Sequence, residues 1–159
     1  MSNVAHEHGG EAASLNAVAL RATRHCLTGC AIGEIAGTVA GAALALSPQV
    51  TLALGLVLAF VFGYSLTLVP LLRAAIPLGR ALGITLAADT VSIVVMETVD
   101  NLFVLLVPGA MDAGVTDALF WGSLLIGLAI AFVVAFPVNR WLIARGRGHA
   151  VAHAGGAHH

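Results

Sequence analysis

Residues 24–41 read RHCLTGCAIGEIAGTVAG, and this stretch decides the fold that the chain is expected to adopt. It is apolar for most of its length, as a membrane-spanning helix is, yet it contains two cysteines and a glutamate. Cys26, Cys30 and Glu34 are spaced four residues apart, so a helix would place all three on one side. Glycine also recurs at every fourth position, at Gly29, Gly33, Gly37 and Gly41. The stretch therefore predicts a helix with one reactive face and one face of small residues.

The whole chain is too apolar for a water-soluble domain. Of its 159 residues, 59% are hydrophobic and only 9% are charged, whereas soluble domains are about half apolar and a quarter charged. The net charge is −1 and all seven basic residues are arginine, so no basic surface indicates a nucleic-acid partner. Two cysteines are too few for a disulfide framework. Composition predicts an integral membrane protein whose surroundings are the lipid bilayer.

Four apolar runs are each long enough to cross a bilayer. They cover about residues 26–46, 50–72, 81–107 and 118–143. A helix of about 20 residues spans the hydrocarbon core, and no run alternates polar and apolar residues as a membrane strand would. The fold class predicted is all-α, a transmembrane four-helix bundle.

The spans divide the chain into three parts. Residues 1–23 form an N-terminal tail or interfacial segment, residues 24–145 the four-helix domain, and residues 146–159 a histidine-rich C-terminal tail. Residues 11–23 can form a short amphipathic helix on the inner membrane surface, although a plain linker fits them equally well.

Every arginine falls on one side of the four spans. Two precede the first span, two lie between the second and third, and three follow the core of the fourth. They are Arg21, Arg24, Arg73, Arg80, Arg140, Arg145 and Arg147. Because basic residues are enriched in cytoplasmic segments, this distribution places both termini in the cytoplasm.

The third span carries an unusual number of acidic residues. Its sequence LAADTVSIVVMETVDN (residues 86–101) contains three carboxyl groups, each costing roughly 2.5–3.5 kcal/mol to insert. No arginine lies at the same depth, so we expect these groups to be protonated, hydrated or bound to a cation. An ion or proton path facing the first span is predicted from Asp89, Glu97, Asp100 and Asn101. The alternative is that protonated acids merely hydrogen-bond neighbouring helices. The second and fourth spans show no such row and are expected to be lipid-facing walls.

The thiols suggest a metal ion. Two cysteines one helical turn apart suit a soft or borderline metal, Cu(I) or Zn(II), although a cysteine in an apolar helix is usually only a small hydrophobic residue. His149 and His153 are also four residues apart, a common chelating spacing in a helix. The candidate metal ligands are Cys26, Cys30, His25, Glu34, Met96, His149 and His153.

The glycine stripe predicts close helix packing. Small residues at every fourth position let another backbone approach, and we expect the stripe of residues 29–41 to pack against the third span or against a second copy of the chain. The second option favours a homo-oligomer.

Several stretches together resemble one bacterial family. They are HCLTGCAIGEIAG (25–37), AFVFGYSLTLVPLLRAA (59–75), LAADTVSIVVMETVDN (86–101), VPGAMDAG (107–114), LFWGS (119–123) and FPVNRWLIARGRGHAVAH (136–153). They are similar to an uncharacterised four-helix membrane family with an HCxxGCxxGE motif, catalogued as a domain of unknown function and sometimes attached to multicopper-oxidase-like sequences. The resemblance implies a multi-pass protein of the bacterial inner membrane and points to copper. It also implies that His149 and His153 are native, but it does not extend to His158 and His159.

Three classes of function stay open. The first is an integral membrane protein that binds a transition metal, copper(I) or zinc, and handles or transports it along a Cys/Glu/Asp-lined seam between the first and third spans. A periplasmic or cytoplasmic metalloprotein would then be a fitting partner. The second is a haem or thiol redox protein, which the absence of C-x-x-C-H and C-x-x-C motifs disfavours. The third is a non-catalytic structural or accessory subunit. No residue is assigned a catalytic role.

Overall fold

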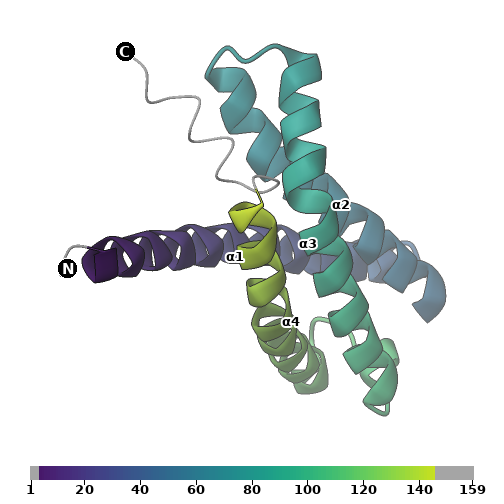
Figure 1. The fold of residues 1–159 in the computed structure, drawn as a ribbon. Coiled ribbons are helices and arrows are strands. Elements are labelled where there is room, and N and C mark those ends of the chain that lie inside the picture. The colour runs from purple at the N-terminus through teal and green to yellow at the C-terminus, as the bar shows by residue number, and fades with distance from the viewer. Residues whose placement is uncertain (1–3, 146–159) are drawn as a thin grey trace.

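The computed structural model describes the backbone of residues 4–145 and the side chains of residues 14–145. Within this range the chain is helical, with short connections and no strand (Figure 1). The elements are α1 (Val4–Ala43), α2 (Pro48–Arg73), α3 (Leu78–Leu106), the 3-10 turn η1 (Ala110–Asp112) and α4 (Ala118–Ala144).

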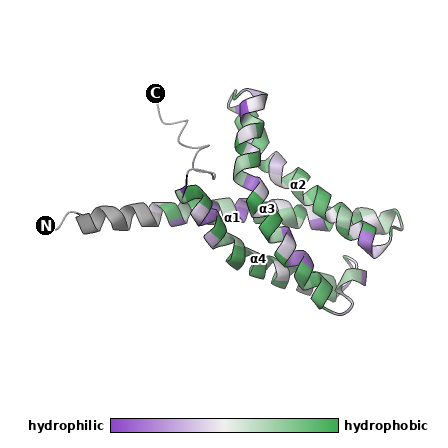
Figure 2. Cartoon of the chain, turned by 45° about the vertical axis from the view of Figure 1, so that its right-hand side comes forward, coloured by the Kyte–Doolittle hydropathy of each residue, from purple (hydrophilic) through white to green (hydrophobic). Residues whose placement is uncertain are grey.

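All four long helices have the length and hydropathy of a membrane span. The candidate spans are Ser14–Ala43, Pro48–Arg73, Leu78–Leu106 and Ala118–Ala144. In Figure 2, residues coloured as apolar make up most of the length of the helices, and hydrophilic residues occur in short stretches. Large apolar side chains such as Leu106 and Val133 are 72% and 70% exposed, which suits contact with lipid acyl chains rather than water. The prediction of an all-α four-helix membrane fold is confirmed.

The turns after α1 and after α2 are built in the same way. Each helix ends two residues before an alanine in the left-handed conformation, Ala45 (φ 51°) or Ala75 (φ 58°). The amide of Leu46 then donates to the Gly41 carbonyl at 2.9 Å, and the amide of Ile76 donates to the Leu71 carbonyl at 3.2 Å. These are the six-to-one hydrogen bonds of a Schellman helix end. Proline follows shortly in both cases, so the next helix starts with a new direction.

The glycine stripe of α1 packs against α2, and this corrects the expectation that it meets the third span or a second copy. A Cβ added to Gly29 or Gly37 would lie 2.5 Å from the Cα of Gly63 or Gly55, respectively. At Gly33 an added Cβ would meet the backbone of Ala59, and at Gly41 it would meet the side chain of Thr51. The two helices are antiparallel, so the rows run past each other in opposite order: Gly29, Gly33, Gly37 and Gly41 against Gly63, Ala59, Gly55 and Thr51. The stripe is used within the chain and no longer supports a homo-oligomer.

The beginning of α1 is joined to the end of α4. Asn139 donates to the Thr23 hydroxyl at 2.9 Å, and Arg140 donates to the Asn16 side chain at 2.7 Å. Ala19 and Ala22 pack against Ile143 in a small apolar cluster. Residues 11–23 lie within one continuous helix, since no break separates them from the span that follows.

Neither α2 nor α4 is a plain lipid-facing wall. Each presents a row of small or polar residues at every fourth position, buried against the other helices. In α2 the row is Gly55, Ala59, Gly63 and Thr67, and in α4 it is Ser123, Gly127, Ala131, Ala135 and Asn139. Close packing of small residues, rather than large apolar side chains, holds the centre of the bundle together.

Replacing Gly33 by alanine tests the α1–α2 contact. The added methyl would meet the backbone of Ala59, which cannot move aside as a flexible side chain can, so we expect Gly33→Ala to lower the free energy of unfolding by about 1–3 kcal/mol. Gly83→Ala is the matched control, because a Cβ there meets nothing within 4 Å. Thermal unfolding of both variants in detergent measures the difference. Equal melting temperatures for the two variants would contradict the packing described.

Candidate functional site

A row of polar side chains runs between α1 and α3 through the middle of the bundle. We call it the polar seam and define it by Cys26, Cys30, Glu34, Asp89, Glu97 and Asp100. Each α1 member interacts with a carboxyl group of α3: Cys26 with Asp89, Cys30 with Glu97, and Glu34 with Asp100. This order arises because both helices run away from the arginine-rich end of the molecule, so residues later in α1 meet residues later in α3. The structure thus unites the two rows that the sequence placed on separate helices.

Polar side chains form a small interaction network at the end of the seam nearest the arginines. The Cys26 thiol lies 3.7 Å from Asp89 Oδ1, and His25 Nε2 lies 3.0 Å from the Thr67 hydroxyl of α2. Asp89 also interacts with Thr67 and with His25. His25 therefore belongs to the network around the Asp89 carboxyl group, to which Thr67 of α2 also contributes.

In the middle of the seam, three sulfur-containing side chains are buried together, and we call this group the sulfur cluster. Cys26, Cys30 and Met96 are 2%, 1% and 0% exposed and belong to one packed group. The other buried members of this group are Ala59, Ile93, Ala131 and Ala135. All four long helices meet here, and the fully buried residues that α2 and α4 contribute are alanines. Both cysteines are free thiols.

Glu97 and Asn101 lie next to the sulfur cluster, on the side farther from the arginines. The Asn101 side-chain amide donates to the Glu97 backbone carbonyl at 2.7 Å and to its carboxyl Oε2 at 3.2 Å. Glu97 is 3% exposed and also interacts with the Cys30 thiol. Asn101 thus holds the carboxyl group that faces Cys30.

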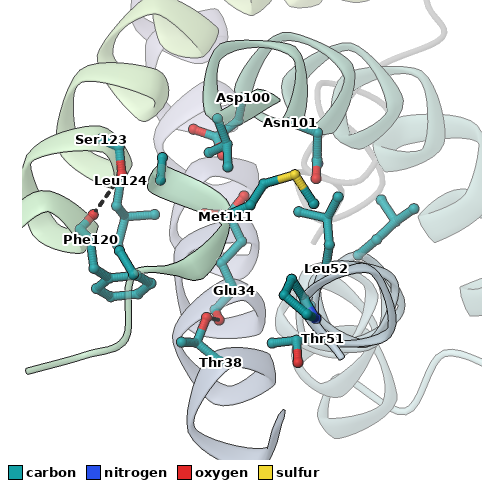
Figure 3. Close-up of a pocket in the computed structure, with 16 residues that line it drawn as sticks. Glu34, Thr38, Thr51, Leu52, Asp100, Asn101, Met111, Phe120, Ser123 and Leu124 are labelled. Carbon is teal, nitrogen blue, oxygen red and sulfur yellow. Dashed lines mark hydrogen bonds between the residues drawn. The ribbon is translucent and has the colours of Figure 1, made fainter. Parts of the chain in front are cut away.

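Glu34 and Asp100, at the end of the seam farthest from the arginines, line a cavity. Glu34 and Asp100 face each other at a partly open cavity of about 80 Å³, and Figure 3 shows both side chains among its lining residues. Its polar lining comes from all four long helices: Glu34, Thr38, Thr51, Asp100, Asn101 and Ser123. Met111, in the connection between α3 and α4, also lines it.

Asp100 is the most enclosed acid of this cavity. It is 3% exposed, and its side chain lies against Gly127, where any Cβ would collide with the carboxyl group. Its Oδ1 atom has no hydrogen-bond partner among the described residues. This oxygen lies against Gly127, which does not line the cavity, and buried oxygens of Thr85, Ser92 and Glu97 share its lack of a partner among the described residues.

The structure brings some of the predicted metal ligands together and separates others. Cys26, Cys30 and Met96 share one cluster, whereas His25 bonds to Thr67 and Glu34 lies two turns from Cys26, beside Asp100. Among the residues that the structure describes, no group of three or more His, Cys, Asp and Glu side chains could hold a metal ion. His149 and His153 lie outside the described residues.

Several residues of the site were missed by sequence reasoning. Thr67 links His25 to Asp89, and Gly127 makes room for the Asp100 carboxyl group. Both belong to the four-residue rows of α2 and α4, which are visible in the sequence as Gly55-x3-Ala59-x3-Gly63-x3-Thr67 and Ser123-x3-Gly127-x3-Ala131. The repetition of small residues was the signal that could have found them.

Fold and site together define a class: a four-span integral membrane protein with a thiol–carboxyl seam buried at its centre. The chain belongs to the family described as a domain of unknown function, DUF4396, whose model matches residues 16–148. No curated protein and no solved structure matches the chain significantly. The family match covers every residue of the seam and supplies no activity.

Thiol labelling tests the burial of the sulfur cluster. Because Cys26 and Cys30 are almost completely enclosed, a maleimide should modify them at least roughly tenfold more slowly in the folded protein than after denaturation. The control is Ser47→Cys in a chain lacking both native cysteines, since Ser47 is exposed in the α1–α2 turn. Mass spectrometry over time measures the rates. Native cysteines that react as fast as the Ser47→Cys thiol would contradict the enclosed cluster.

Proposed function

We propose that this protein handles copper(I) within the bacterial inner membrane, binding the ion at the sulfur atoms of Cys26, Cys30 and Met96. The observation that carries the proposal is the gathering of three sulfur donors in one enclosed cluster between α1 and α3. The chain contains two cysteines and three methionines in total. Both cysteines and one of the methionines belong to this one packed cluster, beside the carboxyl groups of the seam.

The donor set favours Cu(I) over Zn(II). Thiolate and thioether sulfur are soft ligands that select Cu(I), whereas zinc in proteins is almost always bound by four nitrogen, sulfur or oxygen ligands. Among the described residues, no group of three or more His, Cys, Asp and Glu side chains has the arrangement of a metal site. Thioether sulfur from Met96 therefore makes the site suitable for Cu(I) and a poor one for zinc.

The surroundings also fit a passing ion. The Cys26 thiol adjoins Asp89, the Cys30 thiol adjoins Glu97, and the seam continues to the Glu34–Asp100 cavity. Acidic groups in a span are expensive and typically mark ion or proton pathways. We therefore propose that the sulfur cluster is a waypoint on a path rather than a purely structural site.

The positions of the arginines support an orientation of the protein in the membrane. Arg73 ends α2 and Arg80 lies in the first turn of α3. Arg140 and Arg145 lie at the end of α4, at the same end of the bundle as the beginning of the α1 span. We propose that this end faces the cytoplasm. The sulfur cluster would then lie on the cytoplasmic side of the cavity, near a reducing compartment that keeps thiols reduced.

Copper content tests the sulfur site. We expect the purified protein loaded with Cu(I) under reducing conditions to retain about one copper ion per chain, and the Cys26→Ser/Cys30→Ser variant to retain none. Met96→Leu should weaken retention roughly tenfold, because one of three soft ligands is lost. Met111→Leu is the matched control, since Met111 lines the cavity and lies outside the sulfur cluster. Mass spectrometry of bound metal, with a Cu(I) chelator as competitor, measures retention. Equal copper in the wild type and the double cysteine variant would rule out the site.

The affinity for copper should decrease as the pH falls. Thiolates, not thiols, bind the ion, so each cysteine that joins the site releases a proton. Retention should therefore fall as pH falls, by up to roughly tenfold per pH unit for each proton released. Competition titrations at several pH values measure the slope. Retention that is constant between pH 8 and pH 6 would contradict thiolate ligation.

Fusion proteins test the orientation. Green fluorescent protein joined after residue 159 should fluoresce, because it would fold in the cytoplasm. Alkaline phosphatase inserted at Asp112, in the connection between α3 and α4, should be active, because it would be exported. The reverse pattern would show that the arginine-rich end faces outward.

A further inference from the structure

Two exposed arginines near the end of α4 are each held by a neighbouring side chain. Arg140 donates through Nε to the side-chain oxygen of Asn16 on α1 at 2.7 Å. The guanidinium group of Arg145 lies over the Trp141 ring, with its central carbon atom 4.1 Å from the ring centroid. The end of α4 lies against the beginning of the α1 span, which brings Asn16 to this place (Figure 1). We call these four residues the arginine site.

Both guanidinium groups keep N–H donors for a ligand. A guanidinium group has five such donors, and the contact with Asn16 uses only the Nε donor of Arg140. Stacking on Trp141 uses the face of the Arg145 group rather than its N–H bonds. Both side chains are exposed, so their remaining donors are open to an anion. The planar fork of an arginine matches the oxygen atoms of a phosphate group.

The positive charge of this end of the bundle is not balanced by nearby acids of residues 14–145. The acidic residues of this range are buried in the polar seam or lie in the connection between α3 and α4, at the opposite end. Arg21 and Arg24 of α1 are also exposed and add to the positive charge. A negatively charged partner is therefore complementary to this end of the protein.

The depth of the arginine site in the membrane indicates which anion is present. Trp141 is 50% exposed, and tryptophan is enriched at the boundary between the hydrocarbon core and the headgroups. Arg145 follows it by one helical turn, about 6 Å, and the headgroup layer on each side of the core is about 5–8 Å thick. Both arginines therefore lie at the level of lipid phosphate groups.

We infer that the arginine site binds the headgroup phosphate of an anionic phospholipid. Zwitterionic lipids also carry a phosphate group, but their headgroup adds a positive charge that the surrounding arginines repel. The chain has arginine at all seven basic positions and no lysine, and only arginine combines stacking on an aromatic ring with two parallel hydrogen bonds to phosphate. This lipid site goes beyond the proposed copper function and does not depend on it.

Tryptophan quenching measures lipid binding at the site itself. The chain contains two tryptophans, so Trp121→Phe leaves Trp141 as the only reporter. This variant is reconstituted in phosphatidylcholine vesicles that contain a small fraction of spin-labelled phosphatidylglycerol or, in a parallel sample, of equally labelled phosphatidylcholine. We expect labelled phosphatidylglycerol to associate at least roughly tenfold more strongly, since each arginine contributes a factor of about five near anionic headgroups. Trp141→Phe, which reports from Trp121 at the opposite end, should show no preference.

Substitutions in the Trp121→Phe background separate a site from general attraction to charge. Arg140→Gln/Arg145→Gln should reduce the preference for phosphatidylglycerol to below about twofold. Arg73→Gln/Arg80→Gln is the matched control, because it removes the same charge from the α2–α3 turn and should keep the preference. Arg145→Lys retains the charge but loses the planar fork, so we expect the preference to fall roughly threefold.

Four results would overturn the inference. They are equal quenching of Trp141 by the two labelled lipids, an equal loss of preference in the two double glutamine variants, an unchanged preference in Arg145→Lys, and displacement of labelled phosphatidylglycerol by inorganic phosphate at matched ionic strength. The last result would indicate a site for free phosphate rather than for a lipid. Should Arg140→Gln/Arg145→Gln fail to fold, Arg145→Gln decides with an expected loss of roughly fivefold, because the Arg145 guanidinium group contacts an exposed ring.

Discussion

The rest of the structure depends on the close contact between the backbones of α1 and α2. Glycines on one face of α1 let α2 approach until an added Cβ would collide with its backbone. With that face occupied, the neighbouring face of α1, which carries Cys26, Cys30 and Glu34, is turned toward α3 and α4. A single choice of small residues thus determines which side chains point into the centre of the bundle.

The centre is narrow because the surrounding helices also present small residues. Ala59 of α2 and Ala131 and Ala135 of α4 pack around the sulfur atoms, and Gly127 leaves space for the Asp100 carboxyl group. Large apolar side chains point outward, where lipid solvates them. Several of the polar side chains at the centre of the bundle have a defined neighbour on another helix. Cys26, Cys30 and Glu34 each have a neighbour on α3, and Asn139 of α4 donates a hydrogen bond to Thr23 at the arginine-rich end of the bundle.

Much of this arrangement could be predicted from the sequence. Length and hydropathy were enough for four helices, and the four-residue spacing of Cys26, Cys30 and Glu34 was enough for a shared face. That this face meets the acids of α3 followed from the cost of leaving carboxyl groups in lipid. The partner of the glycine stripe could not be predicted in the same way. A row of small residues indicates that the backbone of another helix comes close. Both α2 and α4 have matching rows of small residues, and the sequence alone does not show which of them packs against α1. The partner of His25 was also missed, because Thr67 belongs to a helix whose row of small residues the sequence analysis did not use.

The proposed copper function stands on the meeting of Cys26, Cys30 and Met96, and X-ray absorption at the copper edge tests it most directly. Loaded with Cu(I) under reducing conditions, the protein should give a spectrum of monovalent copper whose nearest neighbours are sulfur atoms alone, two or three in number. A first shell of nitrogen or oxygen atoms, or a sulfur shell that persists in the Cys26→Ser/Cys30→Ser variant, would contradict the account.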